Sequence, residues 1–388
     1  MLIFQPPLRL ILQSTQNIII NNNLSIFRLG IIMTSGYLSI LIKSLIFTCL
    51  SLFTINAYAL NNNVIVPAHK WHTHLPQLSG GGKWSFKYDY SRRLMSGMLN
   101  GKDAVDPEFA LQNSDYEKLP YPGSHDCLLA TDTCLLSAVA EKATMDLHQF
   151  QITYHQSKEL SWGLMLQFLS NTVDLFDKMS PTLPVTPYSL GSNGFGDVQL
   201  SVTKQLASMQ FFDIDLSLGI KLPFGTIDKS DGIIDMSGNT GYVPYAMQIG
   251  SGTYDIITGL TLKGVYHGLE YGSSINRTTR TGMNNQYYNL GDNLKIKAWA
   301  RYTAFFGTQL RIGFTQHVWS PIEGRDARMS DNPRYTGGKR LDALLGLGQR
   351  YKHFGVYADY AFPVLQYLNG VQIKTTGTLL VGIEYKYL

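Results

Sequence analysis

The segment from Phe211 to Leu222 alternates strictly between two kinds of side chain. Every second position is apolar: Phe212, Ile214, Leu216, Leu218, Ile220 and Leu222. The positions between them include Asp213, Asp215 and Lys221. Only a β-strand points successive side chains to opposite faces, so the segment predicts a strand with one apolar and one charged face. Such a strand fits a soluble sandwich or a membrane barrel, and the rest of the chain must decide between them.

The same two-faced pattern recurs along most of the chain. It predicts strands over residues 84–90, 144–155, 162–168, 197–203, 211–222, 253–266, 269–276, 294–303, 309–318, 341–351, 354–362 and 376–388. Long and short connections alternate between these strands. Both termini of the predicted barrel therefore lie on the side of the short turns. This layout is typical of an outer-membrane barrel. We therefore predict an all-β protein, a transmembrane antiparallel up-and-down β-barrel of about 12 strands with short periplasmic turns and long extracellular loops.

A soluble β-sandwich is the alternative fold, but it gives no reason for loops that are long on one side only. The composition agrees with β structure, because 36 Gly and 23 Tyr among 388 residues suggest many turns and strands. The net charge is only +4, and no run of Lys and Arg is longer than a pair. The sequence therefore predicts no nucleic-acid partner.

The N-terminal region has the parts of a secretory signal. Lys43 precedes an apolar run that reaches Ile55, and the sequence Ala57-Tyr58-Ala59 offers a cleavage site. We expect residues 1–32 to be an over-extended start or a disordered extension, 33–59 the signal peptide, 60–82 a periplasmic lead-in and 83–388 the barrel. A single N-terminal membrane anchor is the alternative for the apolar run. The prediction places the protein in the outer membrane of a Gram-negative bacterium.

Two cysteines remain after the expected cleavage. Cys127 and Cys134 enclose six residues within a long polar stretch. In an exported protein such a pair predicts a disulfide that closes a small loop, with a metal pair as the alternative.

Several segments, taken together, resemble a known group of proteins. They are residues 142–148 (KATMDLH), 194–198 (GFGDV), 222–228 (LPFGTID), 244–255 (PYAMQIGSGTYD), 291–292 (GD), 298–300 (AWA) and 337–342 (GGKRLD). The resemblance is to the outer-membrane proteins grouped under the meta-pathway of phenol degradation domain. It implies an outer-membrane transporter for aromatic compounds and, in Met- and His-rich members, a role in copper handling. The chain departs from such barrels by ending on Leu388 after the aromatic Tyr387.

If the apolar face of each strand meets lipid, the other face lines the lumen. The predicted lumen-lining residues are Asp213, Asp215, Lys295, Lys297, Trp299, Arg301, Arg311 and Asp342. Acidic and basic columns that face each other would orient a polar solute in a pore. Alternatively, the charges pair with one another and stiffen a filled barrel.

A second candidate site contains ligands for soft or borderline metals. Its members are His72, His74, Met145, Asp146 and His148, which combine imidazole, thioether and carboxylate groups. The alternative is a solvated histidine-bearing tail.

The sequence contains no G-x-S-x-G motif, and we expect neither an enzyme nor a cofactor. The predicted function is passive diffusion of a small solute, aromatic or hydrophobic in nature if the resemblance holds. A metal-handling barrel and a surface protein that binds a partner through its loops are the alternatives. The expected partners are outer-membrane lipid and lipopolysaccharide, the barrel assembly machinery and a solute that the sequence does not identify.

Overall fold

The computed structural model describes residues 83–106, 127–128, 133–134, 138–177, 186–234, 240–326, 328–329 and 333–387. Strands dominate these residues, and the short 3-10 helices η1 (Tyr245–Met247), η2 (Phe305–Gly307) and η3 (Pro333–Tyr335) lie between them. No helix among the described residues is long and apolar enough to span a membrane.

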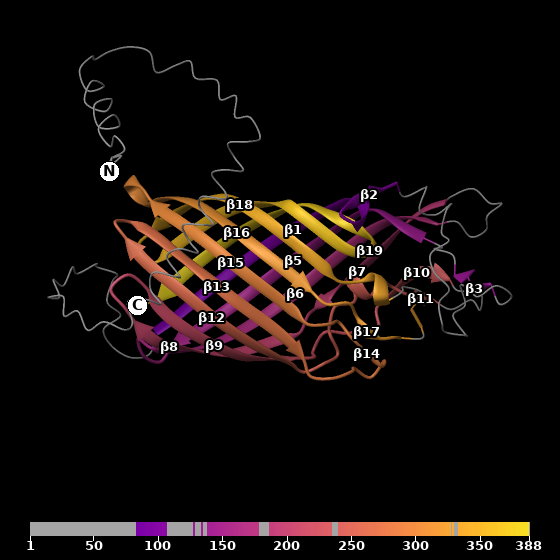
Figure 1. Cartoon of the computed structure of the whole chain (residues 1–388). Coiled ribbons are helices and arrows are strands. Elements are labelled where there is room, and N and C mark those ends of the chain that lie inside the picture. The colour runs from indigo at the N-terminus through magenta and orange to yellow at the C-terminus, as the bar shows by residue number, and fades with distance from the viewer. Residues whose placement is uncertain are drawn as a thin grey trace, which may run out of the picture. The chain divides into compact units, whose positions relative to one another are not determined.

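Eleven strand elements of the described chain form one closed antiparallel sheet (Figure 1). In chain order they are β1 (Lys83–Gly101), β5 (Ala138–His155), β6 (Leu160–Asp177), β8 (Val198–Ser208), β9 (Asp213–Leu222), β12 (Asp255–Tyr266), β13 (Leu269–Arg280), β15 (Asn293–Thr303), β16 (Thr308–Trp319), β18 (Gly338–Tyr351) and β19 (Phe354–Tyr387). Each strand pairs with the next along the chain, and β19 pairs with β1. The ring therefore has no free edge, as a barrel in lipid requires.

The last element, β19, crosses the barrel twice. Its first half pairs with β18, from Phe354 to Leu368, and its second half pairs with β1 as far as Tyr387. The two halves meet at Gly370, which has a φ of 71°, and the Lys386 amide donates a hydrogen bond of 3.0 Å to the His353 carbonyl. The described strands thus make the twelve crossings that the sequence predicts, and the predicted barrel class is confirmed.

Large apolar side chains cover the outside of this barrel. Exposed examples on the strands are Phe150, Trp162, Leu218, Ile256, Ile275, Ile312, Leu345 and Leu347. Aromatic rings mark the end with the short turns, where Trp84 lies between Tyr154 and Tyr387 in the strand register. An apolar outer band with aromatic residues at its border is the surface of a barrel in lipid.

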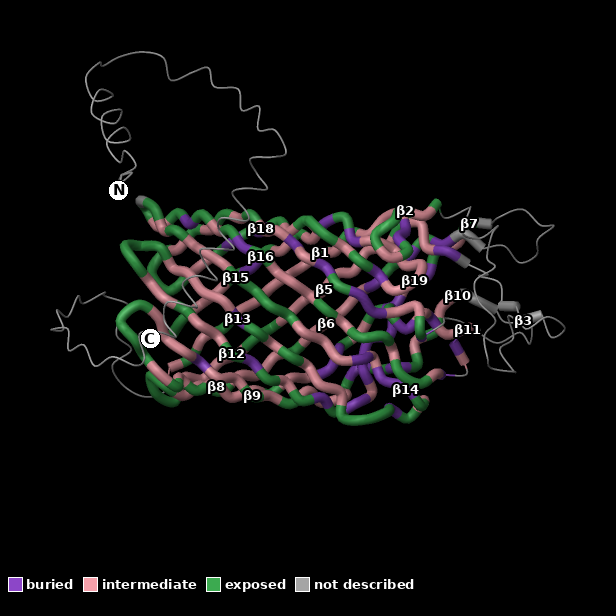
Figure 2. The backbone as a smooth tube through the Cα atoms, viewed as in Figure 1, coloured by how far each residue is buried: buried purple, intermediate pink, exposed green. Residues whose placement is uncertain are grey.

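Several strands extend further than the alternating pattern predicts. The first strand continues past Tyr90 to Gly101, and β6 continues to Asp177. The sequence predicts a connection between the strands over 162–168 and 197–203, and this is wrong in part, because β7 (Thr186–Phe195) pairs with the second half of β6. A further short strand, β2 (Asp103–Val105), pairs with the end of β1. These extensions belong to the end opposite the short turns, where the buried residues gather around β14 (Tyr288–Asn289) and its neighbours (Figure 2).

The remaining short strands belong to the long connections. β3 (Cys127–Leu128) pairs with β4 (Thr133–Cys134), β10 (Ser230–Ile234) with β11 (Thr240–Tyr242), and β14 with β17 (Glu323–Gly324). The β3–β4 register places Cys127 directly opposite Cys134. The backbone arrangement is compatible with the expected disulfide, which stays a prediction.

Candidate functional site: the inner wall and the clamp at its outer end

The predicted lumen residues share the inward face of the barrel. Each alternates with outward apolar residues of its strand, as Lys295 and Lys297 do on either side of the exposed Ile296. The same alternation puts the others on this face: Asp213, Asp215, Trp299, Arg301, Arg311 and Asp342. Because a closed barrel has only two faces, these side chains point inside.

Most of the inward charges pair with a neighbour on the wall. Asp215 and Lys263 lie 2.5 Å apart, and Arg340 lies 2.9 Å from Asp342. Arg301 forms an ion pair with Glu270. The pairs join adjacent strands or the same strand, so these charges do not stand as opposed columns.

Arg311 and Asp359 form a bidentate pair that spans an intervening strand. The guanidinium Nε and Nη2 donate to the two carboxylate oxygens at 2.7 and 2.9 Å. Gly346 lies between them in the register, and a Cβ there would lie 1.9 Å from Asp359 Oδ1. Tyr357 stacks beneath the same arginine, with 4.1 Å from Arg311 Cζ to the ring centroid. A glycine in the strand thus leaves the room that the ion pair needs.

Gly382 has the same function for Tyr357, whose hydroxyl donates across it to Asp89. A Cβ on Gly382 would lie 2.2 Å from Tyr357 Cζ. We expect Gly382→Ala to lower the free energy of unfolding by about 1–3 kcal/mol, the usual cost of overpacking. Thermal unfolding of the folded barrel measures it. Gly355→Ala on the same element is the control, because its Cβ would meet nothing closer than Glu384 Cβ at 4.0 Å. Equal stability of the two variants would contradict the contact.

A cavity of 860 Å³ lies at the end with the short turns. Its wall includes Lys263, Glu270, Trp299, Arg301 and Glu384. Charged residues of its lining come from β9, β12, β13, β15, β18 and β19 and surround the inner mouth of the barrel.

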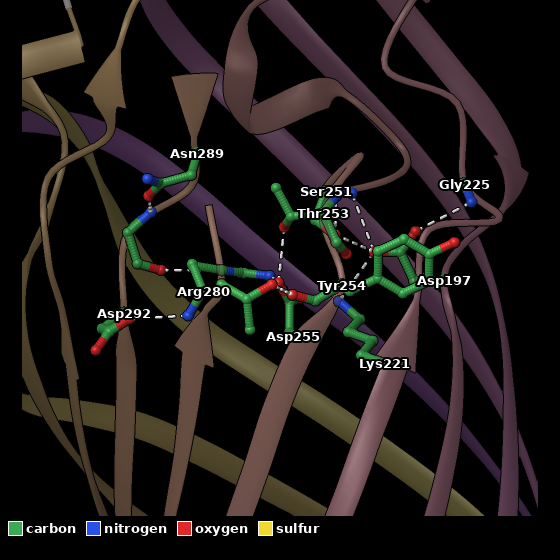
Figure 3. Close-up of polar contacts among 12 residues, drawn as sticks. Asp197, Lys221, Gly225, Ser251, Thr253, Tyr254, Asp255, Arg280, Asn289 and Asp292 are labelled. Atoms are coloured by element: carbon green, nitrogen blue, oxygen red, sulfur yellow. Dashed lines mark hydrogen bonds and ion pairs between the residues drawn. The ribbon is translucent and has the colours of Figure 1, made fainter. Parts of the chain in front are cut away.

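At the opposite end, a buried carboxylate holds the connection between β9 and β12, residues 223–254, which we call the clamp loop (Figure 3). Asp197 Oδ1 accepts a hydrogen bond of 3.0 Å from the Gly225 amide. Its Oδ2 accepts from the amide and the hydroxyl of Ser251, at 3.0 and 2.7 Å. Lys221 Nζ lies 3.3 Å from the same oxygen. Asp197 is 2% exposed, so one carboxylate joins both ends of the loop out of contact with water.

The fold brings Asp197 to this position by a break between two strands. β7 and β8 follow one another along the same edge of β6, and Gly196-Asp197 is the interval between them. The Gly196 amide donates a hydrogen bond of 2.9 Å to the Gln167 carbonyl of β6, which keeps these two residues attached to the barrel wall. Asp197 can then turn its side chain toward the loop, as residues at strand breaks often do.

A second set of polar contacts joins the end of the clamp loop to the next hairpin. Asp255 is fully buried and accepts from the Thr253 hydroxyl at 2.7 Å and from the Arg280 guanidinium. Arg280 Nε also donates a hydrogen bond of 3.0 Å to the Gly291 carbonyl, and the Arg280 amide donates one of 3.0 Å to Asp292 Oδ1 (Figure 3). The start of β12 and the end of β13 are thereby fixed to the loop before β15.

Asp292 lies outside the spanning strands and is held by two arginines. Burial raises its pKa, but the hydrogen bond from Arg277 Nη2, at 2.7 Å, and that from the Arg280 amide outweigh burial. The net effect is a lowered pKa. The carboxylate therefore stays ionised near neutral pH and keeps both contacts.

The clamp loop packs against the inner wall. Met247 and Val243 of the loop bury their side chains with Val173 and Leu175 of β6 and Leu190 of β7. The Met247 carbonyl accepts from Ser192 Oγ at 2.6 Å and from Asn171 Nδ2 at 3.3 Å. Because Val173 and Leu175 alternate with the exposed Thr172 and Asp174, they point inward. The loop therefore occupies part of the outer mouth.

Two glycines let the loop close on itself. Gly225 and Gly250 pack backbone against backbone, and a Cβ on Gly250 would lie 2.0 Å from the Gly225 carbonyl oxygen. The Gly250 amide donates 2.9 Å to the Thr226 carbonyl in the same place. Only glycine allows this approach, which explains why the loop carries it at both points.

The predicted metal ligands do not come together among the described residues. Met145 points inward, whereas Asp146 and His148 lie on the outer face with Tyr90. Arg92 binds both Asp146 oxygens at 2.7 Å. His72 and His74 lie outside the described residues. No group of three or more metal-binding carboxylate, imidazole or thiol side chains occurs in the described part of the chain, and metal binding stays a prediction.

Sequence reasoning missed several inward residues: Asp89, Arg93, Glu270, His317, Arg340, Tyr357 and Asp359. Most of them fit the alternation of their strands and could have been found by extending it. Arg93 was missed because the first strand was predicted to end three residues before it. Asp197 lay within a noted motif, but its contact with Ser251 joins residues 54 positions apart.

No family model matches the chain, and no curated protein matches it significantly. The resemblance to the phenol-pathway family therefore stays an expectation. Among solved structures, the chain is similar to an outer-membrane channel from Pseudomonas putida F1, with a TM-score of 0.51 and 10% identity over 83% of this chain and 100% of that chain. A FadL homologue of Pseudomonas aeruginosa has a TM-score of 0.36 and 9% identity, over 79% of this chain and 90% of that chain. The toluene transporter TodX of Pseudomonas putida has a TM-score of 0.36 and 9% identity, over 79% of this chain and 89% of that chain. The first likeness supports the barrel fold.

Proposed function

We propose that the protein is a passive diffusion channel of an outer membrane and that the clamp loop narrows its outer mouth. Two lysines give the main support. Lys295 and Lys297 point into a closed barrel and are nevertheless exposed, so the wall beside them is not filled by side chains. A barrel of twelve crossings is wider than the eight-stranded barrels whose interior side chains fill completely.

The two ends of the barrel support a path with a narrow outer part. The cavity at the inner mouth is wide and charged. At the outer mouth, Met247 and Val243 rest on the wall and Asp197 holds the loop. A solute entering from outside would pass the clamp loop before it reached the charged interior.

The inner wall favours a polar solute over a hydrocarbon. Ion pairs such as Arg311 with Asp359 and Arg301 with Glu270 line much of it. An aromatic solute would therefore need a polar group to replace the water it leaves. Metal handling and capture of a surface partner stay alternatives, and no contact among the described residues favours either.

Single-channel recording in planar bilayers tests the proposal. The purified full chain should give discrete current steps in potassium chloride, because a water-accessible lumen passes ions. Heat-denatured protein in the same detergent is the control and should give none. Silence of the folded protein under conditions where it inserts would contradict a diffusion channel.

A further inference from the structure

Three cationic side chains of the inner wall, Arg93, Lys295 and Lys297, form no ion pair with another described residue. Opposite charges act on two of them only at longer range, Asp342 on Arg93 and Asp89 on Lys297, and each of these carboxylates is paired with another cation. Other inward cations form ion pairs, as Lys221 with Asp197 and Lys263 with Asp215 illustrate. The difference sets these three apart from the paired charges of the same wall.

The strand register gathers further nitrogen donors around them. Lys295 lies directly opposite His317, and His317 lies opposite Arg340, so three adjacent strands present a row of basic side chains. Lys297 is the next inward residue on its strand, about 7 Å from Lys295. Arg93 lies within electrostatic range of Lys295 and Arg340.

Two of these nitrogens are buried with unused hydrogen-bonding capacity. Arg93 Nε and His317 Nε2 have no hydrogen-bond partner in the described structure. Such nitrogens are costly to bury unless a ligand or water satisfies them. Their position beside the unpaired lysines indicates where a ligand would accept hydrogen bonds.

The residues directly opposite the lysines in the strand register offer no carboxylate. Lys295 faces Asn276 and His317 across its strand, and Lys297 faces Ser274 and Thr315. The first 88 residues of the chain contain no Asp or Glu. Among the described strands, the row of Lys295, His317 and Arg340 contains no carboxylate. The next inward row on the same three strands contains one, Asp342, which pairs with Arg340.

We propose that Arg93, Lys295 and Lys297 form a binding subsite for a small organic carboxylate in the lumen. Cations that line a cleft with low-dielectric walls concentrate anions from solution. Lysine and arginine bind carboxylate oxygens through charge-assisted hydrogen bonds. Trp299, the next inward residue after Lys297, supplies an apolar surface for the body of the solute.

The subsite rests on the proposed channel and makes it selective for anions. In planar bilayers with a potassium chloride gradient, the wild-type chain should pass chloride in preference to potassium. The double variant Lys295→Gln with Lys297→Gln should lower the chloride-to-potassium permeability ratio roughly fivefold, the effect of removing nearby charges in a largely aqueous site. Removing two charges that repel each other should leave the barrel folded, which its thermal unfolding midpoint checks.

Lys339→Gln is the matched control. Lys339 is adjacent to Arg340 on β18, but it lies on the outer face with Tyr367, 5.3 Å from its Nζ to the ring centroid. Its replacement should leave the permeability ratio unchanged. If channels open but the double variant keeps the wild-type ratio, the subsite is wrong while the channel stands.

Equilibrium dialysis of benzoate against the detergent-solubilised barrel decides the case in which no channel opens. Benzoate should bind the wild type and the Lys339→Gln variant, and binding should weaken at least fivefold in the double variant. Benzyl alcohol, which has a similar shape and no charge, should not distinguish the variants. Equal benzoate binding by all three proteins would overturn the subsite whatever the conductance.

Discussion

Replacing Asp197 with alanine should release the clamp loop and raise the single-channel conductance. The carboxylate accepts three hydrogen bonds from Gly225 and Ser251 and pairs with Lys221. Its loss leaves a partly buried ammonium and two buried amides without partners. Each buried polar group that is left unsatisfied costs about 1–3 kcal/mol. The loop also contacts the wall through Met247 and Val243, and we expect the lost free energy to shift its equilibrium toward the detached state.

Conductance in planar bilayers and limited proteolysis within 223–254 measure the release. Asp228→Ala is the control, because it removes a carboxylate from the same loop whose partner, Arg328, lies 2.9 Å away at the surface. Asp228 has an exposed side chain, 53% by area, and exposed pairs contribute about 0–1 kcal/mol. The control should keep the wild-type conductance. A folded Asp197→Ala barrel with wild-type conductance and proteolysis would show that the loop does not narrow the path.

The spanning strands could be predicted because lipid and lumen impose alternation on them. Every residue of β9 from Asp213 to Leu222 follows this rule. Beyond the membrane the rule loses its cause, since both faces of a strand can contact loops or water. Val173 and Leu175 bury their side chains under the clamp loop, and Asp174 between them is exposed. The alternating pattern therefore predicts a connection where the outer half of β6 and the whole of β7 lie.

The inward face could be predicted, but the pairing of its charges could not. Alternation alone places Asp215 inside, whereas its pairing with Lys263 depends on the stagger between β9 and β12. The pair between Arg311 and Asp359 depends in addition on a glycine in the strand between them. Stagger is set by the closure of the whole barrel, which no single segment encodes.

The unpaired lysines show how a local pattern and a global register combine. Lys295 and Lys297 alternate with apolar residues, which is enough to predict that they point inward. Whether they are neutralised depends on what lies opposite, and the register supplies Asn276, Ser274 and Thr315. Sequence reasoning placed these cations opposite the acidic residues of β9, but Asp215 is already paired with Lys263. The surplus positive charge is therefore visible only in the folded wall.

Replacing Leu218 with arginine should destabilise the barrel more than the same change one residue earlier. Leu218 lies near the middle of β9 and is 48% exposed on the outer face. An arginine on the lipid face near the bilayer midplane costs about 2–4 kcal/mol. Ser217 points inward and its hydroxyl lies 2.8 Å from that of Thr203, so an arginine there would meet water and polar groups. Ser217→Arg should therefore cost about 1 kcal/mol, the contribution of one hydrogen bond.

Urea titration of the folded barrel in lipid vesicles measures both changes against the wild type. The comparison isolates the surroundings, because the two positions share a strand, a depth and a substituted side chain. Hydrocarbon outside the wall and water inside it cause the large difference in destabilisation between the two variants. Equal destabilisation at both positions would mean that the two faces of β9 meet the same surroundings. An outer wall in contact with water would then replace the lipid-facing wall, and the closed inner path would lose its physical basis.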